Sequence, residues 1–294
     1  MLVLFFPDYA FQGRALATEL SAPWAEVDVH HFPDGESRIR LPSTLPSEVV
    51  LCRSLDHPNS KLIELVLVAR AARKLGVRHL TLVAPYLCYM RQDMVFHPGE
   101  VVSQQILGEV LAELFDAVIT VDPHLHRIHS LEEAIPARFV LALSAASLMG
   151  SFLENQDLHE NTLLLGPDQE SIQWVETIAH THGLRYAVAT KQRNGDCEVS
   201  ISLPDIDYRN QIVVVVDDVA STGCTLAETS QALYACGVTR VAVLVTHALF
   251  GTESLERLEQ AGIKGIWSTD SVFHHTNVIA LADLLASGIR QING

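Results

Sequence analysis

Short apolar runs recur along this chain, and they constrain the fold more than any other feature of the sequence. The runs are near-continuous rather than alternating in polarity, which is typical of strands buried on both faces of a parallel sheet. Segments with helical periodicity lie between them, at 60–75, 103–115 and 225–236, and this alternation predicts βαβ units. The runs are Leu2–Phe6, Val49–Cys52, Leu80–Ala84, Ala117–Val121, Phe139–Leu143, Thr162–Leu165, Ala187–Ala189, Ile212–Val216 and Val241–Val245.

The number of these runs is too large for one compact sheet. A length of 294 residues suits either one large domain or two domains of ordinary size. The proline-containing, helix-rich region at 135–155 is the natural boundary. We therefore predict an α/β protein with two domains of similar size, 1–145 and 146–294, each a mostly parallel sheet flanked by helices.

Composition and charge exclude several functions. The formal net charge of −15 argues against nucleic-acid binding, which needs a basic face. The five cysteines are scattered and form no CxxC pair, which predicts a reducing compartment, the cytoplasm, with no disulfide framework and no zinc site. The N-terminal sequence MLVLFFPDYAF indicates a first strand rather than a signal peptide, and no segment approaches the roughly 20 apolar residues of a membrane span.

Polar segments follow strand after strand. Ligands of open parallel sheets bind outside the carboxyl ends of the strands, so these segments are the candidates for a functional site. They read PYLCYMRQD after Ala84, DPHLH after Val121, GPDQES after Leu165, TKQRNGD after Ala189, DDVASTGCT after Val216 and THALF after Val245.

The segment DDVASTGCT carries the most specific pattern. Its backbone N–H groups and hydroxyls open a helix and suit a phosphate, whereas its two carboxylates suit the hydroxyls of a sugar. The pattern therefore fits either an ordinary helix N-cap or a site for a phosphorylated sugar. The residues of such a site are Asp217, Asp218, Ser221, Thr222, Gly223, Cys224 and Thr225.

This segment resembles the phosphoribosyl-binding loop that phosphoribosyltransferases and ribose-phosphate pyrophosphokinases share. Two further segments favour the second family. The sequence around Phe32, Asp34 and Glu36 resembles its Phe-x-Asp-Gly-Glu motif, which contributes to an ATP site across a subunit interface. The tripeptide Arg91-Gln92-Asp93 resembles its RQD segment, and the following Phe-x-x-Gly-Glu (96–100) is similar to the archaeal type rather than to the main bacterial and mammalian class.

Three more segments match the family in order along the chain. The resemblance implies that His124 and Asp168 serve Mg²⁺, and that Lys191 and Arg193 are catalytic cations at the start of a mobile loop. Two positions depart from the family pattern. Gln169-Glu170-Ser171 replaces a glycine-containing stretch, and Cys224 replaces a glycine that lets the backbone approach a phosphate.

The resemblance implies two phosphoribosyltransferase-like domains and a homo-oligomer that is at least a dimer. It also implies pyrophosphoryl transfer from Mg-ATP to the anomeric hydroxyl of ribose 5-phosphate, giving 5-phosphoribosyl 1-diphosphate and AMP. In this prediction Phe32, Asp34, Glu36, Arg91, Gln92 and Asp93 bind ATP. The alternatives are a transferase for another sugar phosphate, a phosphoribosyltransferase, and a non-catalytic synthetase-associated homologue; the presence of Lys191 and Arg193 argues against the last.

Overall fold

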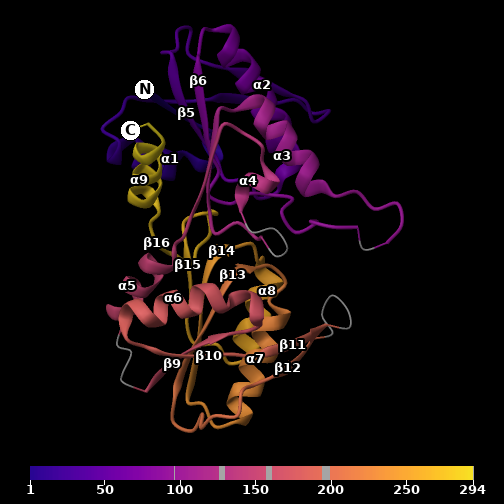
Figure 1. Ribbon diagram of the computed structural model, residues 1–294, viewed down its shortest axis with the longest axis vertical. Helices are drawn as coiled ribbons and strands as arrows, with labels where there is room; N and C mark the ends of the chain where they lie inside the picture. The colour runs from indigo at the N-terminus through magenta and orange to yellow at the C-terminus, as the bar shows by residue number, and fades with distance from the viewer. Residues whose placement is uncertain (96, 126–129, 157–160, 194–198, 294) are drawn as a thin grey trace. The chain divides into compact units, whose positions relative to one another are not determined.

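The computed structural model (Figure 1) describes residues 1–95, 97–125, 130–156, 161–193 and 199–293. The chain forms two compact units. Unit 1 comprises Met1–Leu143 and Leu281–Gly294, and unit 2 comprises Ser144–Ala280. Each unit contains one six-stranded parallel sheet with helices on its faces, which confirms the predicted α/β fold class.

The sheet of unit 1 has the strand order β2-β1-β5-β6-β7-β8. Every pair of neighbours is parallel, and the central strands are buried on both faces, as the unbroken apolar runs predict. The strands are β1 (Leu2–Phe5), β2 (Trp24–Glu26), β5 (Glu48–Cys52), β6 (His79–Val83), β7 (Ala117–Val121) and β8 (Phe139–Leu143).

Helices cover both faces of this sheet. Helices α1 (Ala10–Glu19) and α9 (Ala282–Asn293) contact each other, and so do α2 (Pro58–Lys74) and α3 (Ser103–Leu114). The fully buried side chains of α2 and α3 form one core with the sheet, and each buried leucine contributes roughly 1.5–3 kcal/mol. The short elements are the 3₁₀ helix η1 (Pro7–Tyr9) and helix α4 (Leu131–Ala134).

Unit 2 has the sheet order β10-β9-β13-β14-β15-β16, again parallel throughout. Helices α7 and α8 contact each other, as do α5 and α6. The strands are β9 (Thr162–Gly166), β10 (Arg185–Val188), β13 (Ile212–Ala220), β14 (Arg240–Ala248), β15 (Ile266–Thr269) and β16 (Asn277–Ile279). The helices are α5 (Ala146–Glu154), η2 (Gln169–Ser171), α6 (Ile172–His182), α7 (Cys224–Ala235) and α8 (Thr252–Gln260).

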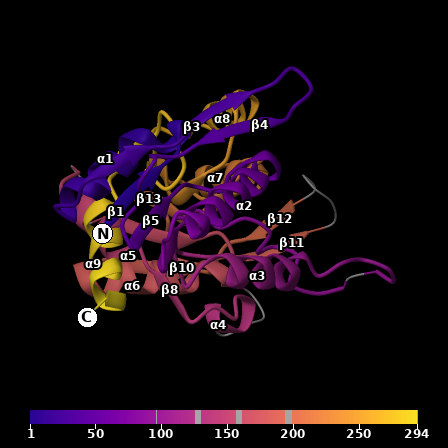
Figure 2. The same cartoon turned by 90° about the horizontal axis from the view of Figure 1, so that it is seen from above.

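Each unit also carries a two-stranded antiparallel hairpin outside its main sheet. In unit 1 it is formed by β3 (Asp28–His31) and β4 (Ser37–Arg40), and Figure 2 shows it extending away from the rest of the unit. In unit 2 it is formed by β11 (Thr190–Arg193) and β12 (Val199–Ser202). Both hairpins lie between the second and third sheet strands of their unit along the chain.

Every apolar run predicted as a strand is a strand, and the three predicted helices begin and end within two residues of α2, α3 and α7. Gly76 and Gly237, which follow α2 and α7, both have positive φ, as helix-ending glycines do. Among the described residues, no helix is both long enough and apolar enough to span a bilayer.

Candidate active site

The strand β13 delivers the predicted sugar-phosphate loop to the carboxyl edge of the unit 2 sheet. Its residues Val213–Val216 are fully buried between β9 and β14. Asp217 and Asp218 lie near the end of the strand, followed by the loop at 221–223 and the N-terminus of α7. An N-terminus of a helix of this length presents unpaired N–H groups and a favourable dipole for an anion.

Gly223 is the residue that allows the loop to turn into α7. It precedes the helix with φ +72°, in the left-handed region that glycine adopts at no steric cost. A Cβ at this position would lie 3.3 Å from the Leu258 side chain and 3.4 Å from the Ser254 carbonyl oxygen. The backbone of the loop therefore packs closely against α8.

Helix α8 supports this loop through two side chains that the sequence analysis did not identify. Ser254 Oγ donates to the carbonyl oxygen of Ser221 at 3.1 Å, and Arg257 Nη1 donates to the carbonyl oxygen of Thr222. Arg257 also places a positive charge beside the loop that is predicted to bind a phosphate. No sequence signal marks Arg257, because it lies in a polar helix that resembles any solvent-facing helix.

Cys224 begins α7 and is buried. Cys52, Cys88 and Cys236 are free thiols, and Cys197 lies outside the described residues. Arg257 Nη1 lies 3.3 Å from Cys224 Sγ, so the same arginine contacts both the loop and the first residue of the helix.

Carboxylates crowd the end of β13. Burial, and then the neighbouring charges of Asp218 and Asp168, raise the pKa of Asp217 well above its ordinary value, although Lys191 opposes this. Asp217 Oδ1 accepts from the backbone N–H of Asp218 at 3.0 Å, and Asp218 Oδ1 accepts from that of Val219 at 2.7 Å. These bonds fix the orientation of both acids, and the repulsion between them would be relieved by a cation or by hydroxyl donors.

Lys191 and Asp168 meet in the same region. Lys191 Nζ lies 3.0 Å from Asp168 Oδ2, and both side chains are largely buried. Asp168 follows β9, which pairs directly with β13, so the sheet register brings Asp168 and the acids of β13 to the same edge. Arg193 ends β11, and its side chain lies outside the described part of the structure.

The departure at Gln169-Glu170-Ser171 is accommodated without glycine. These residues form the 3₁₀ helix η2, which Asp168 caps by accepting from the backbone N–H of Glu170 at 3.1 Å. None of these residues has a positive φ, so no backbone strain follows from the absence of glycine. A glycine is needed at Gly166 instead. A Cβ at that position would lie 2.3 Å from Ser171 Oγ, so the Gly166 backbone and the Ser171 side chain pack closely together.

The residues predicted to bind ATP belong to unit 1. Phe32, Asp34 and Glu36 lie on the turn of the β3–β4 hairpin, and all three are exposed. The backbone N–H of Phe32 donates to the Glu36 carbonyl at 2.8 Å, and Asp34 Oδ1 accepts from the N–H of Glu36 at 3.2 Å. Asp34 therefore stabilises the turn, as a turn aspartate does, while the Phe32 ring remains 42% exposed.

The other predicted ATP residues follow β6. Arg91 is exposed, while Gln92 and Asp93 are partly buried. Gln92 Nε2 donates to the Met94 carbonyl at 3.1 Å and lies 3.4 Å from Glu100 Oε2, so this amide holds the start of the segment that leads to α3. Phe96 lies outside the described residues.

The predicted metal ligands lie in different units. His124 follows β7 in unit 1, two residues after Asp122, which has φ +39°. Asp168 lies in unit 2. In the described part of the chain, no group of three or more His, Cys, Asp or Glu side chains is arranged to hold a metal ion. The donor chemistry of Asp168, Asp217 and Asp218 nevertheless fits Mg²⁺, which takes one or two carboxylates and completes its coordination with water and substrate phosphates.

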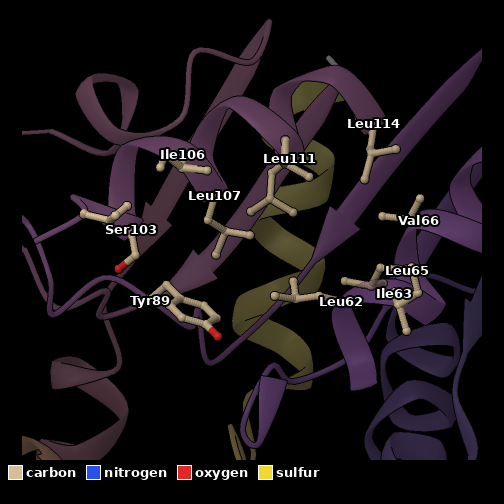
Figure 3. Close-up of a pocket in the computed structure, with 12 residues that line it drawn as sticks. Leu62, Ile63, Leu65, Val66, Tyr89, Ser103, Ile106, Leu107, Leu111 and Leu114 are labelled. Carbon is tan, nitrogen blue, oxygen red and sulfur yellow. The ribbon is translucent and has the colours of Figure 1, made fainter. Parts of the chain in front are cut away.

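An apolar pocket lies elsewhere in unit 1, between α2 and α3 (Figure 3). It has a volume of about 370 Å³, and Tyr89 and Ser103 supply the polar side chains of its lining. No charged side chain lines it, so it offers no counter-charge to a triphosphate or a sugar phosphate. The remaining lining residues are Leu62, Ile63, Leu65, Val66, Val101, Ile106, Leu107, Val110, Leu111 and Leu114.

The amino-acid sequence of the chain matches a family of known proteins. Residues 10–114 match the N-terminal domain of ribose phosphate pyrophosphokinase, and residues 141–273 match the phosphoribosyl transferase domain. The chain is 33% identical over 296 residues to the ribose-phosphate pyrophosphokinase of Methanopyrus kandleri, with 100% of both chains covered. It is 30% identical over 278 residues to that of Saccharolobus solfataricus, with 88% of this chain and 89% of the relative covered.

A solved structure gives the same result for the fold. The phosphoribosylpyrophosphate synthetase from Mycobacterium smegmatis superposes with a TM-score of 0.85 at 22% identity, covering 100% of this chain and 99% of that chain. The predicted similarity to archaeal members is confirmed by the two archaeal relatives. Since the similarity spans both units in chain order, the protein belongs to the ribose-phosphate pyrophosphokinase family.

Proposed function

We propose that the protein transfers the pyrophosphoryl group of Mg-ATP to ribose 5-phosphate, forming 5-phosphoribosyl 1-diphosphate and AMP. The oxygen of the anomeric hydroxyl forms a bond to the β-phosphorus of ATP. The bond from that phosphorus to the oxygen bridging the α- and β-phosphates breaks, AMP leaves, and the hydroxyl proton is released to solvent. The observation that carries the proposal is the convergence of Asp168, Lys191 and Asp217 beside a phosphate-type loop in unit 2.

The loop after β13 would hold ribose 5-phosphate. Asp217 and Asp218 would accept hydrogen bonds from the 2- and 3-hydroxyls, which relieves part of the repulsion between the two carboxylates. The N-terminus of α7 and the hydroxyl-bearing loop would bind the 5-phosphate, with Arg257 contributing positive charge nearby. The residues assigned to this site are Asp217, Asp218, Ser221, Thr222, Gly223, Cys224 and Thr225.

Lys191 and Arg193 would stabilise the transition state. In phosphoryl-type transfer the protein mainly positions the reactants and neutralises charge that shifts toward the leaving group. The ion pair between Lys191 and Asp168 supports this role, because it holds a cation at the carboxyl edge of the sheet. Mg²⁺ would neutralise and orient the phosphates of ATP, and Asp168 and His124 are the residues assigned to it.

ATP would be held by residues of unit 1: Phe32, Asp34, Glu36, Arg91, Gln92 and Asp93. The exposed Phe32 ring suits stacking on a base, and the exposed carboxylates suit the amino group or the ribose hydroxyls. We further propose that the ATP site is shared between subunits of a homo-oligomer, because these hairpin side chains are exposed rather than packed against unit 1. A cytoplasmic location stays a prediction.

The activity is tested by incubating the protein with ATP, Mg²⁺ and ribose 5-phosphate and measuring both products. The proposal predicts AMP and 5-phosphoribosyl 1-diphosphate in equal amounts. The Lys191→Ala variant is the control for contaminating activity and should form neither product at an appreciable rate. No AMP at any Mg²⁺ concentration would refute the assignment, and faster turnover of a different pentose phosphate would identify a relative with changed sugar specificity.

A further inference from the structure

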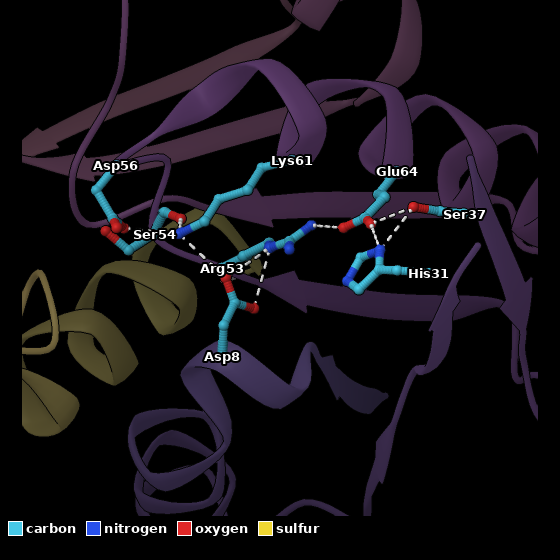
Figure 4. Close-up of polar contacts among 8 residues, drawn as sticks. All are labelled: Asp8, His31, Ser37, Arg53, Ser54, Asp56, Lys61 and Glu64. Carbon is cyan, nitrogen blue, oxygen red and sulfur yellow. Dashed lines mark hydrogen bonds and ion pairs between the residues drawn. The ribbon is translucent and has the colours of Figure 1, made fainter. Parts of the chain in front are cut away.

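The β3–β4 hairpin, which carries Phe32, Asp34 and Glu36, pairs with neither six-stranded sheet. An isolated two-stranded hairpin is marginally stable in water. The position of its turn must therefore depend on side-chain contacts with the rest of unit 1. Figure 4 shows where those contacts lie.

Glu64 of α2 makes the central contact. Its side chain is 1% exposed, and its Oε1 accepts a hydrogen bond from Ser37 Oγ at 2.6 Å. The same oxygen lies 3.5 Å from His31 Nδ1, and His31 Nδ1 lies 3.1 Å from Ser37 Oγ. Because the Ser37 hydroxyl donates its proton to Glu64, its oxygen remains available to accept from His31.

His31 and Ser37 are paired across the last rung of the hairpin, immediately before and after the turn at 32–36. Glu64 therefore contacts both strands at the point from which the turn projects. A shift of this carboxylate would move both ends of the turn together. Glu64 thus joins His31 of β3 and Ser37 of β4 through a single carboxylate oxygen.

The second oxygen of Glu64 is held from inside the unit. Glu64 Oε2 accepts from Arg53 Nη1 at 2.6 Å, and the Arg53 side chain is 7% exposed. Arg53 is fixed in turn by Asp8, at 3.1 Å from its Nε, and by the Phe6 ring, whose centroid lies 3.9 Å from its Cζ. A buried charge paired on one side and hydrogen-bonded on the other has little freedom to move.

We propose that Glu64 is a positioning residue for nucleotide binding, acting through Ser37 and His31 to fix the hairpin turn. This inference rests on the proposed function, since it takes the turn to contact ATP. A purely structural role for the network would lower stability and affect both substrates equally. A positioning role instead predicts a loss confined to ATP.

The test is made at Ser37, because replacing Glu64 would leave Arg53 buried without its partner and destabilise unit 1. Ser37→Ala removes the hydrogen bond from β4 to Glu64, together with the Ser37–His31 contact, and leaves the Arg53–Glu64 pair in place. We expect the KM for ATP and the Kd for Mg-ATP to rise about tenfold, with the KM for ribose 5-phosphate changed by less than about twofold. Ser37→Thr, which keeps the hydroxyl, should restore the wild-type values.

Ser43→Ala is the matched control, since Ser43 is an exposed serine in the loop that follows β4. Calorimetric titration of Mg-ATP measures binding without turnover. It therefore separates the proposed function from the positioning role of Glu64. If wild type binds no Mg-ATP, the proposed function fails and this inference fails with it. If wild type binds Mg-ATP but Ser37→Ala binds it equally well, or raises both KM values equally, only the positioning role is refuted.

Discussion

In both units a hairpin follows the second strand of the sheet and a helix follows the third, and the strand order is the same. The third strand of unit 1, β5, is followed by the buried cation Arg53, which pairs with Asp8 and Glu64. The third strand of unit 2, β13, carries the acids Asp217 and Asp218 near its carboxyl end. The carboxyl-end regions of the two third strands thus carry opposite charges.

The helices that follow these strands, α2 and α7, also differ at their N-termini. In unit 1, α2 begins at Pro58, which has no N–H to offer a ligand, and Lys61 donates to the loop carbonyl of Ser54 and pairs with Asp56. In unit 2, α7 begins after Gly223, and the preceding Thr222 is exposed. In both units, side chains of the same unit hold carbonyl oxygens of the loop, but the unit 2 loop adds a glycine and the exposed Thr222 directly before its helix.

The largest expected effect is on kcat, and it should distinguish Lys191 of unit 2 from Lys61 of unit 1. Lys191→Ala should lower kcat by about 10²–10³, because it removes positive charge from the transition state. Lys61→Ala should lower the free energy of unfolding by about 1–3 kcal/mol with little change in kcat, because Lys61 pairs with Asp8 at 3.0 Å and with Asp56 at 2.7 Å. Steady-state kinetics measure kcat and urea unfolding measures stability. A loss of kcat in Lys61→Ala that equals the loss in Lys191→Ala would contradict the difference between the two units.

The second prediction concerns the crowded acids of unit 2. Asp218→Asn should raise the KM for ribose 5-phosphate by about tenfold or more, because a charged acceptor for a sugar hydroxyl is lost. The same change should raise the free energy of unfolding by roughly 1 kcal/mol, because it relieves repulsion with Asp217 while keeping the acceptor for the Val219 N–H. A variant that is less stable and binds the sugar normally would contradict this.

The third prediction uses the left-handed residue that precedes the helix in each unit. Gly223→Ala should lower stability by about 1–2 kcal/mol and weaken ribose 5-phosphate binding, because alanine is strained at φ +72° and close to Leu258. His57 has φ 47° at the corresponding place in unit 1, and His57→Gly should raise stability by about 0.5–1 kcal/mol without affecting kinetics. Thermal unfolding and substrate titration check both variants.

The smallest expected effect is the pH dependence of the stability that Asp116 gives to unit 1. Asp116 is partly desolvated, but hydrogen bonds from the Leu80 N–H at 2.7 Å and from Arg73 at 2.9 Å leave its pKa below the ordinary value. The ionised Asp116 carboxylate therefore adds to the free energy of unfolding. This stabilisation is complete above the unfolded-state pKa and is lost as the pH falls through the lowered folded-state pKa. Asp116→Asn should cost about 1 kcal/mol at pH 7, discounted for solvent screening, and the cost should shrink below pH 4. Equal costs at both pH values would contradict the assignment.

The sequence predicts the buried strands well because an apolar run is the direct signature of a strand covered on both faces. It misses β2, β15 and β16, which are short and near the sheet edges, and both hairpins, whose strands lie outside the apolar cores. Strand β4, for example, reads SRIR, with half of its side chains exposed. Such strands carry no hydrophobic pattern that a sequence reading can detect.

Some features of the candidate site can also be predicted from the sequence, and others cannot. The proximity of Asp168 to the acids of β13 follows from topology, because the strands that precede them are paired in parallel. Arg257 and Glu64 carry no local signal, since charged residues on helices usually face solvent. Their contacts depend on tertiary packing that brings α8 to the loop and α2 to the hairpin.

The central claim is that unit 2 binds the sugar phosphate and unit 1 does not. Isothermal titration of ribose 5-phosphate tests it most directly, with wild type compared with Thr222→Asp, which places a negative charge in the exposed loop. We expect one site per chain in wild type and none in the variant, because the added carboxylate repels the phosphate. Two sites per chain, or one site that survives in Thr222→Asp, would contradict the claim.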